Sequence, residues 1–418
     1  MRIRTLLNKF EYLKSFVYKN EFLEKKNAKE VLIIEIVPRK NSRAVCSGCG
    51  ESGSTYDHTP VARDFEFVPL WGMSSFFRYR MRRVNCRQCG VRIEQIPWAQ
   101  GKQTLTKTYG QFLAHWAKTL SWAEVARAFN SSWYHVYEGV KQVVEYGLKH
   151  RDLSDIEAIG IDEIHYGKGH NYLTMVYQLD GDNKRLLSIA KKRTVKSLLK
   201  CFREIGKDNL PAIKFVCTDM WKPYLKVIKK KLPGALNILD RFHIVKKLNE
   251  AVNQVRIEET RRLKSEGYEP VLDNTKYCFL KREENLTEKQ NDKLKDILQY
   301  DLKSVRAYLL KVSFEAFWQY KSAYWAEQYL KKWCTRTMRS RLEPMKKFVK
   351  TLRRHQPLLM NWFKAKKAYS SGAVEGLNRK VNLVTRKSYG FRSYEILKIA
   401  LFHTMGNLPE PKRTHSFF

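Results

Sequence analysis

The sequence contains no long apolar run and has few acidic residues for its length. No stretch approaches the roughly 18 apolar residues of a membrane span, and charges interrupt the apolar N-terminus, so neither a membrane span nor a secretory signal is expected. Asp and Glu number 42 against 79 Lys and Arg, a formal net charge of +37. A hydrophobic content of 43% supports buried cores, which excludes a disordered tail. We therefore predict a cytoplasmic protein whose partner is a polyanion.

The sequence also lacks the cysteine pattern typical of a disulfide-bonded protein. Four of the eight lie singly among apolar or helical neighbours, at positions 201, 217, 278 and 334. The other four form two CxxC pairs, each followed by a glycine: Cys46 with Cys49, and Cys86 with Cys89. Doubled CxxC spacing is typical of a structural Zn²⁺ held by four thiolates, so we predict one such ion. Two reduced pairs and two disulfides are the alternatives.

The residues between the cysteine pairs alternate between apolar and polar side chains. Residues 64–70 and 75–84 therefore predict a β-hairpin and, with the CxxC pairs, a zinc ribbon. By the same alternation Arg78, Arg80 and Arg82 share one face of the second strand. That stripe suits contact with DNA phosphates, although a solvated strand face has the same pattern.

From Thr104 onward the periodicity becomes helical. We predict a first helix within TKTYGQFLAHWAKTL, a short helix N-capped by Ser121, and a longer helix that starts near Ser132. This arrangement resembles a helix-turn-helix, with Trp133, Tyr134 and His135 at the exposed start of the recognition helix. A helical hairpin that serves packing alone is the alternative.

The central region has the pattern of a mixed sheet. Five strands are predicted, at residues 156–162, 171–180, 184–192, 212–219 and 235–240, with Gly181, Asp182 and Asn183 as the turn between the second and third. Helices are predicted near 194–206 and 221–231. This order predicts an α/β ribonuclease-H-like core, a five-stranded sheet whose first three strands are antiparallel and whose later strands add in parallel.

Two of these strands end on a carboxylate, Asp162 and Asp219. Either residue alone would be better explained as a helix cap or turn residue, but their joint placement on the first and fourth strands favours a metal site. Asp240 ends the fifth predicted strand and opens the next helix, and His243 lies one helical turn further. The pair could cap the next helix, or support the metals and contact a phosphate.

Residues from about 246 to 365 are helical and basic. Eight Lys or Arg and no acid occur at 346–367, among them Lys346, Lys347, Lys350, Arg353 and Arg354. Phe348, Trp362 and Phe363 lie among them, which suits a surface that follows DNA, with a solvated helix face as the alternative.

A late helix supplies a third carboxylate. Ser370 and Ser371 could cap a helix that carries Glu375, and Asn378 and Arg379 lie on the same face. Glu375 by itself would be an ordinary surface residue.

As an ordered set, GIDE (160–163), CTDMWKPY (217–224), DRFHIV (240–245) and SSGAVEGLNRKV (370–381) resemble the DDE transposases of the ISL-three family of bacterial insertion sequences. The resemblance implies that Asp162, Asp219 and Glu375 bind two Mg²⁺ or Mn²⁺ ions for cleavage and strand transfer of double-stranded DNA. From the charge distribution and the order of the modules we further hypothesise that the zinc ribbon and the helix-turn-helix recognise the terminal inverted repeats, while the basic insertion holds flanking or target DNA. Pairing of two element ends favours at least a dimer on DNA. A DNA-binding regulator without catalysis and a structure-specific nuclease remain alternatives.

Six segments follow from this interpretation. They are an N-terminal segment (1–38), a zinc-binding domain (39–100), a helix-turn-helix domain (101–150), the first part of the catalytic domain (151–245), a basic α-helical insertion (246–365) and the last part of the catalytic domain (366–418).

Overall fold

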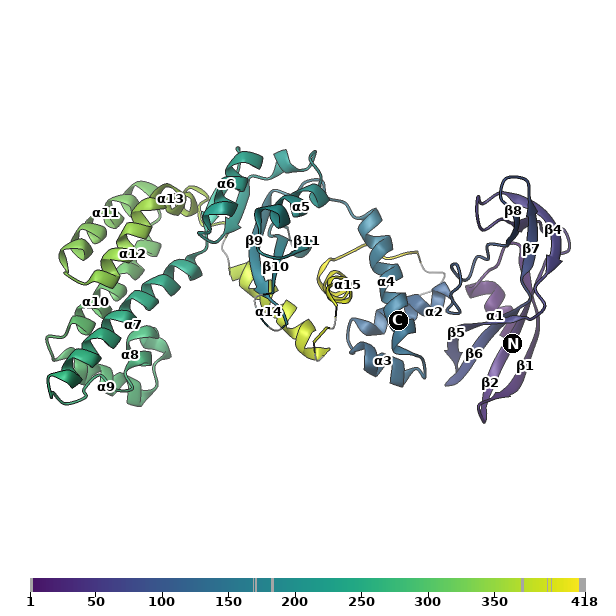
Figure 1. The fold of residues 1–418 in the computed structure, drawn as a ribbon, viewed down its shortest axis with the longest axis horizontal. Helices are drawn as coiled ribbons and strands as arrows, with labels where there is room; N and C mark the ends of the chain where they lie inside the picture. The colour runs from purple at the N-terminus through teal and green to yellow at the C-terminus, as the bar shows by residue number, and fades with distance from the viewer. Residues whose placement is uncertain are drawn as a thin grey trace. The chain divides into compact units, whose positions relative to one another are not determined.

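The computed structural model describes residues 3–167, 169, 171–181, 184–369, 372–388, 390–391 and 393–412. The chain forms two compact units (Figure 1). The first combines the residues up to Asp152 with those from Val381 onward, and the second runs from Leu153 to Lys380. No helix in the described part of the chain is long and apolar enough to span a membrane.

The first 38 residues, in which no motif was identified, build part of a sheet. After α1 (Ile3–Phe10), β1 (Phe16–Lys26) and β2 (Lys29–Pro38) join β5 (Arg63–Leu70) and β6 (Met73–Tyr79) in the order β1-β2-β6-β5. Phe65, Phe77 and Trp98 are fully buried in its core. The predicted hairpin is confirmed over β5 and β6, although it belongs to this sheet and not to the one that carries the cysteines.

The cysteine-bearing sheet has the order β3-β4-β7-β8. Its strands are β3 (Ala44–Val45), β4 (Ser52–His58), β7 (Arg82–Cys86) and β8 (Gly90–Ile93). The prediction that the second hairpin strand continues to residue 84 is therefore wrong at its C-terminal end. The chain leaves the first sheet after Tyr79 and pairs with β4 from Arg82. Buried Met81 continues the apolar alternation across the break, so periodicity alone could not reveal it.

The three predicted helices follow, as α2 (Lys107–Ala117), α3 (Trp122–Ala128) and α4 (Trp133–His150). Ser121 forms a capping box with Glu124 at the start of α3, and Ser132 caps α4 by accepting a hydrogen bond from the His135 backbone N–H. Helix α15 (Tyr394–Met405) packs against α4.

The second unit contains the five-stranded sheet, in the order β11-β10-β9-β12-β13. The strands are β9 (Ala158–His165), β10 (Tyr172–Gln178), β11 (Arg185–Lys191), β12 (Phe215–Thr218) and β13 (Leu236–Leu239). The first three are antiparallel, and β12 runs parallel to both β9 and β13, which confirms the predicted mixed sheet. Asp182 and Asn183, predicted as turn residues, lie outside the described residues.

Helices cover the two faces of this sheet. Helices α5 (Val195–Ile205) and α6 (Lys222–Lys231) share one buried core with Ile159, Ile161 and Val216. On the opposite face, the helix α14 (Gly372–Lys387) places Val374 over Gly160, where an added Cβ would lie 2.5 Å from a Val374 methyl carbon. Asp162 therefore faces α14, while Glu163 faces α5 and α6.

A series of helices lies between β13 and α14, in the region where a helical insertion was predicted (Figure 1). It comprises α7 (Arg241–Ser265), α8 (Lys276–Leu280), α9 (Glu288–Leu298), α10 (Lys303–Glu315), α11 (Ala323–Arg339), α12 (Glu343–Arg354) and α13 (Gln356–Lys364). Three short 3-10 helices, η1 (Leu210–Ala212), η2 (Glu283–Asn285) and η3 (Ala316–Gln319), complete the second unit. Glu259 is buried in α7 and accepts hydrogen bonds from the backbone N–H groups of Lys303 and Ser304, which fixes the start of α10 against α7.

Candidate active site and metal centre

The four paired cysteines converge. Their sulfur atoms lie within 4.8 Å of one another, and Cys49 Sγ is 3.4 Å from Cys86 Sγ. Four sulfurs bound at about 2.3 Å to one tetrahedral ion are about 3.8 Å apart, so the cluster fits Zn²⁺. A Cβ on Gly48 would lie 3.0 Å from Cys89 Sγ, which shows how closely the backbone wraps the site. Backbone hydrogen bonds with Cys89 and Gln88 lower the pKa of Cys86 to about 7, whereas the hydrogen bond to Cys49 raises the pKa of Cys89 to about 12. Cys86 is thus the thiol of this cluster in which the thiolate is favoured.

The register of the central sheet brings Asp219 level with Asp162. Cys217 in β12 pairs with Gly160 in β9, and two further residues along these parallel strands are Asp219 and Asp162. Neighbouring strands are about 4.8 Å apart, so the two residues lie at one edge. The prediction that Asp162 ends its strand is wrong, because β9 continues to His165 through pairing with β10. It is β12 that stops, which leaves Asp162 beyond the end of its parallel neighbour.

Asn378 connects α14 to this edge. Its Nδ2 donates to Asp162 Oδ2 at 2.6 Å, and its Oδ1 accepts from the Tyr177 hydroxyl at 2.9 Å. Burial raises the pKa of Asp162 above its ordinary value. Asn378 thus orients a carboxylate that has little contact with water.

Arg193 links two other carboxylates on the face of α5 and α6. Its Nη2 donates to Asp219 Oδ2 at 2.7 Å, its Nε lies 3.1 Å from Glu163 Oε1, and its guanidinium lies 4.7 Å from the Trp221 ring centre. Burial, followed by the charge of Asp219, raises the pKa of Glu163 to about 7. The second oxygen of Asp219 accepts from the backbone N–H of Trp221 at 2.8 Å.

Asp240 does cap α7, as one of the two predicted roles requires. Its Oδ1 accepts from the Phe242 N–H at 2.6 Å, and its Oδ2 lies 2.8 Å from His243 Nδ1. The hydrogen bond to Asp240 raises the pKa of His243, and the charges of Asp162 and Asp219 act in the same direction. The negative charges of Asp162 and Asp219 therefore both favour the protonated form of His243.

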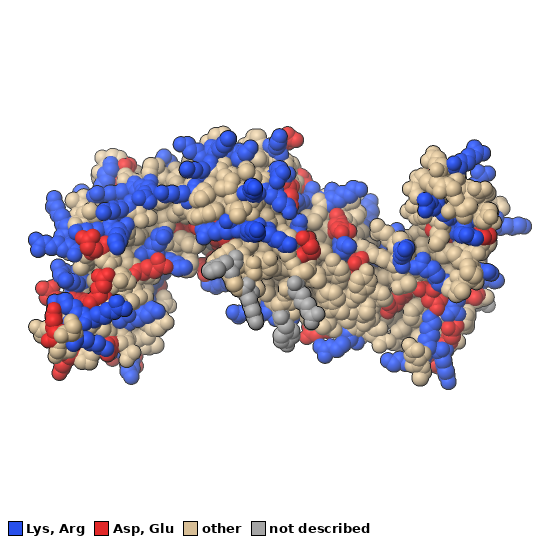
Figure 2. Space-filling view, in the orientation of Figure 1, with Lys and Arg blue, Asp and Glu red and all other residues tan. Residues whose placement is uncertain are grey.

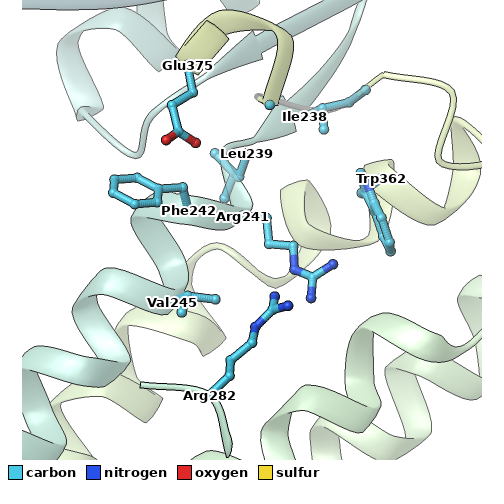
Figure 3. A pocket seen from close by; sticks show the side chains of 9 residues that line it. Ile238, Leu239, Arg241, Phe242, Val245, Arg282, Trp362 and Glu375 are labelled. Carbon is cyan, nitrogen blue, oxygen red and sulfur yellow. The ribbon is translucent and has the colours of Figure 1, made fainter. Parts of the chain in front are cut away.

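Glu375 lies one turn before Asn378 on α14 and is exposed. It pairs with Arg379 at 2.7 Å and lines a pocket of about 320 Å³. Figure 3 shows its carboxylate above Phe242, with the guanidinium groups of Arg241 and Arg282 side by side further along the pocket. Ser370 and Ser371, the predicted cap of this helix, lie outside the described residues.

The carboxylates do not form a closed metal cage. Among the described residues, the four cysteines are the one group of three or more donor side chains within metal-binding reach of one another. Two of the predicted carboxylates instead form ion pairs with cationic side chains: Asp219, after β12, pairs with Arg193, and Glu375, on α14, pairs with Arg379. The donor chemistry still fits hard divalent cations, because Asp162, Glu163, Asp219 and Asp240 supply carboxylate oxygens at one partly buried edge, with Arg193 and His243 as the cations that pair with them. Such an excess of negative charge favours a bound cation.

Comparison with known proteins decides the family. A model of ISL3 (ISL-three) DDE transposases, described as a transposase, matches residues 159–401, more than half of the chain. The chain belongs to the ISL3 family of DDE transposases. The transposase for insertion sequence element IS1001 of Bordetella parapertussis is 25% identical over 354 residues, 84% of this chain and 86% of that protein. The transposase for IS1557 of Mycobacterium tuberculosis is 27% identical over 409 residues, 92% of this chain and 91% of that protein.

The arginine stripe predicted for the N-terminal unit of this transposase is not present. Arg82 is buried and pairs with Glu94 at 2.8 Å, so it cannot reach a phosphate. Arg78 is held between Glu24 and Asp64, and exposed Arg80 donates to the Thr59 carbonyl. The three arginines fall on two sheets and the link between them, which is why they share no face.

The predicted recognition residues lie at the start of α4. Trp133 and Tyr134 are 43% and 58% exposed, so both can contact a ligand. His135 instead pairs with Glu66 at 2.6 Å and contacts Ser131. This pair holds the start of α4 against β5, and it leaves the His135 side chain less available to DNA than those of Trp133 and Tyr134.

The predicted basic surface of the insertion needs one correction. Lys347, Lys350, Arg353 and Arg354 are exposed on α12, while Lys346 pairs with Glu343 at 2.6 Å. Figure 2 shows Lys and Arg side chains gathered over this part of the transposase. The aromatic residues expected among them, Phe348, Trp362 and Phe363, are buried in the core of the insertion. The surface is therefore basic without being aromatic.

Sequence reasoning missed several residues of the site. Tyr177 and Arg193 stand in no recognisable motif, and only the fold brings them to the carboxylates. Glu163 and Arg241 directly follow Asp162 and Asp240, within the motifs GIDE and DRFHIV. That adjacency was the available signal.

Proposed function

We propose that this transposase cuts DNA at the ends of an insertion sequence and joins the cut ends to a target, with Asp162, Asp219 and Glu375 as the ligands of two Mg²⁺ or Mn²⁺ ions. The supporting observation is the Asn378–Asp162 hydrogen bond, because it ties the helix of Glu375 to the strand of Asp162. Asp219 directly follows the neighbouring strand β12, and continuing the register of β12 and β9 brings it level with Asp162. The strand order and the helix on each face support a ribonuclease-H-like core.

The side chains around the carboxylates have definable roles. The Tyr177 hydroxyl engages the amide oxygen of Asn378, so the amide nitrogen faces Asp162 and orients it. Bound divalent cations would activate the attacking oxygen and stabilise the oxygen that leaves phosphorus. The raised pKa of His243 keeps a proton available near this edge, where it can contact a phosphate or the leaving oxygen. Arg241 and Arg282 place two positive charges in the pocket that Glu375 also lines, which suits a DNA phosphate.

Assembly of the site requires two side chains to change partners. Asp219 must release Arg193 and Glu375 must release Arg379 before their carboxylates can act with Asp162. Both ion pairs are accessible enough to open, since Arg193 is 34% and Arg379 77% exposed. Approaching DNA supplies phosphates to receive the released guanidinium groups.

The remaining parts fit the recognition and holding of DNA. We assign the cysteine cluster to one structural Zn²⁺, and the zinc domain (39–100) and helix-turn-helix (101–150) to the terminal inverted repeats. The insertion (246–365) would hold flanking or target DNA on α12, and the catalytic parts (151–245 and 366–418) would act in at least a dimer that pairs two ends.

A strand-transfer assay tests this proposal. Linear DNA that carries both ends of the element, with Mg²⁺, should give joined products with the unmodified protein. Asp162→Asn should reduce cleavage and joining by at least about a hundredfold, because a metal ligand contributes several kcal/mol to the transition state, while DNA binding persists. Asp208→Asn, an exposed carboxylate of the same unit, serves as the control.

The alternatives predict other results. A regulator would bind the ends without cutting them, and a structure-specific nuclease would cut branched DNA without joining. Unchanged strand transfer by Asp162→Asn would remove the assigned metal site.

A further inference from the structure

The tip of the β5–β6 hairpin carries an unusual residue. Leu70 pairs with Met73, so Trp71 and Gly72 form a two-residue turn, with φ of 50° and 79°. Positive φ at both positions defines a type I′ turn, for which Asn-Gly is preferred and a bulky aromatic residue is sterically disfavoured. The β1–β2 hairpin has the same kind of turn at Asn27 and Ala28, and there Asn takes the first position.

Trp71 contributes nothing visible to the fold. It is 75% exposed, the highest value for a large hydrophobic side chain among the described residues. An exposed indole in a disfavoured backbone conformation costs stability, and such outliers gather at functional sites.

The hairpin is fixed beside the start of α4. Glu66 in β5 pairs with His135 of α4 and exchanges backbone hydrogen bonds with Thr104 and Thr106. In β6, Ser74 accepts a hydrogen bond from the Asn130 side chain at 3.4 Å, in the turn before α4. The tip that carries Trp71 is thus held on the same body as exposed Trp133 and Tyr134.

We propose that Trp71 is a DNA-contacting residue, whose indole packs on a base or sugar of the duplex bound by the start of α4. This inference rests on the proposed role of α4 in DNA recognition. Where a base step of the duplex opens, or at a frayed end, the flat face of a base is available to an aromatic ring, and such stacking requires no particular sequence. A side chain at a hairpin tip also protrudes far enough to enter a groove or to separate a base step.

Trp71→Asn separates function from folding, because it creates the preferred Asn-Gly turn. Its melting temperature should equal or exceed that of the unmodified protein. Its affinity for a duplex taken from the element's end, measured by fluorescence anisotropy, should fall by about tenfold, the loss expected for one aromatic contact to a base. Val61→Asn, at a 73% exposed apolar position in the same unit, should bind normally.

Two further measurements complete the test. Trp133→Ala reports on α4 itself: if it and the unmodified protein bind the duplex equally, the proposed role of α4 fails. If Trp133→Ala weakens binding and Trp71→Asn does not, only the role of Trp71 fails. Sedimentation without DNA should show the same oligomeric state for the unmodified protein and for Trp71→Asn. Dissociation of an oligomer by Trp71→Asn would overturn the proposal in favour of a contact between copies.

Discussion

Single residues at the edge of the sheet that carries Asp162 and Asp219 balance the charge of these carboxylates. Arg193 neutralises Asp219 and Glu163, and Asn378 holds Asp162. A guanidinium group and a divalent cation compete for the same carboxylates, since both are attracted by the same negative charge. If a divalent ion binds at the proposed carboxylates, we expect Arg193 to stabilise the metal-free protein and to oppose metal binding.

The variant Arg193→Gln should separate these two effects. Without the guanidinium, Mn²⁺ affinity measured by calorimetric titration should rise about threefold to tenfold, because no side-chain cation has to be displaced. The melting temperature in the presence of a chelator should fall, since Asp219 and Glu163 are left to repel each other. Arg203→Gln, which removes an exposed cation from α5, should change neither quantity. An unchanged Mn²⁺ affinity for Arg193→Gln would show that Arg193 does not compete with the ion.

At the scale of elements, the packing of α14 on β9 decides where Glu375 can act. The helix approaches closely because Gly160 has no side chain under Val374. A larger residue at 160 would force α14 away from the sheet and carry Asn378 and Glu375 with it. Sequence periodicity marks Gly160 only as a weak strand residue.

Gly160→Ala should therefore reduce strand transfer and stability together. Its Cβ would lie 2.5 Å from Val374 and 3.2 Å from Leu179, a clash that costs about 1–3 kcal/mol in a packed core. Adding Val374→Ala should restore much of the activity, because it removes the atom that the new methyl meets. Gly234→Ala, with open space around its Cβ, is the control. Denaturant unfolding and strand transfer are measured on the unmodified protein, on Gly160→Ala, on Val374→Ala and on the double variant. Additive effects of the two substitutions would show that the idea is wrong.

On the scale of the whole molecule, the net charge of +37 sets the strength of DNA binding and its response to salt. Acidic side chains of the protein itself neutralise part of this charge, as in the ion pairs of Arg78, Arg82 and Arg193. The exposed cations of α12 remain available for phosphates.

Replacing Lys347, Lys350, Arg353 and Arg354 together by Gln tests this surface. The slope of log affinity against log salt concentration should become shallower by about 3 to 4, since each phosphate contact contributes about 0.9. Lys346→Gln should have little effect, because Lys346 is paired with Glu343. If the unmodified protein and the fourfold variant give equal slopes, these four side chains of α12 do not contact the DNA phosphates.

Local signals made most of the elements predictable. The cap residues Ser121, Ser132 and Asp240 begin their helices as expected, because capping depends on residues within one turn. The five strands follow from continuous apolar runs, and the cysteine cluster follows from CxxC spacing. Family membership likewise followed from motifs that lie within single segments.

Long-range pairing decided the rest. Partners distant in the sequence determine that β6 stops at Tyr79 and that the strand of Asp162 continues beyond it. They also determine that Arg82 is buried. The same holds for the Tyr177–Asn378–Asp162 chain, which joins residues about two hundred positions apart. The sequence by itself determined the elements, the metal-binding residue types and the family, because these rest on neighbouring residues. Only the tertiary structure decided which carboxylates face one another and which cations hold them, because that choice depends on sheet register and helix packing.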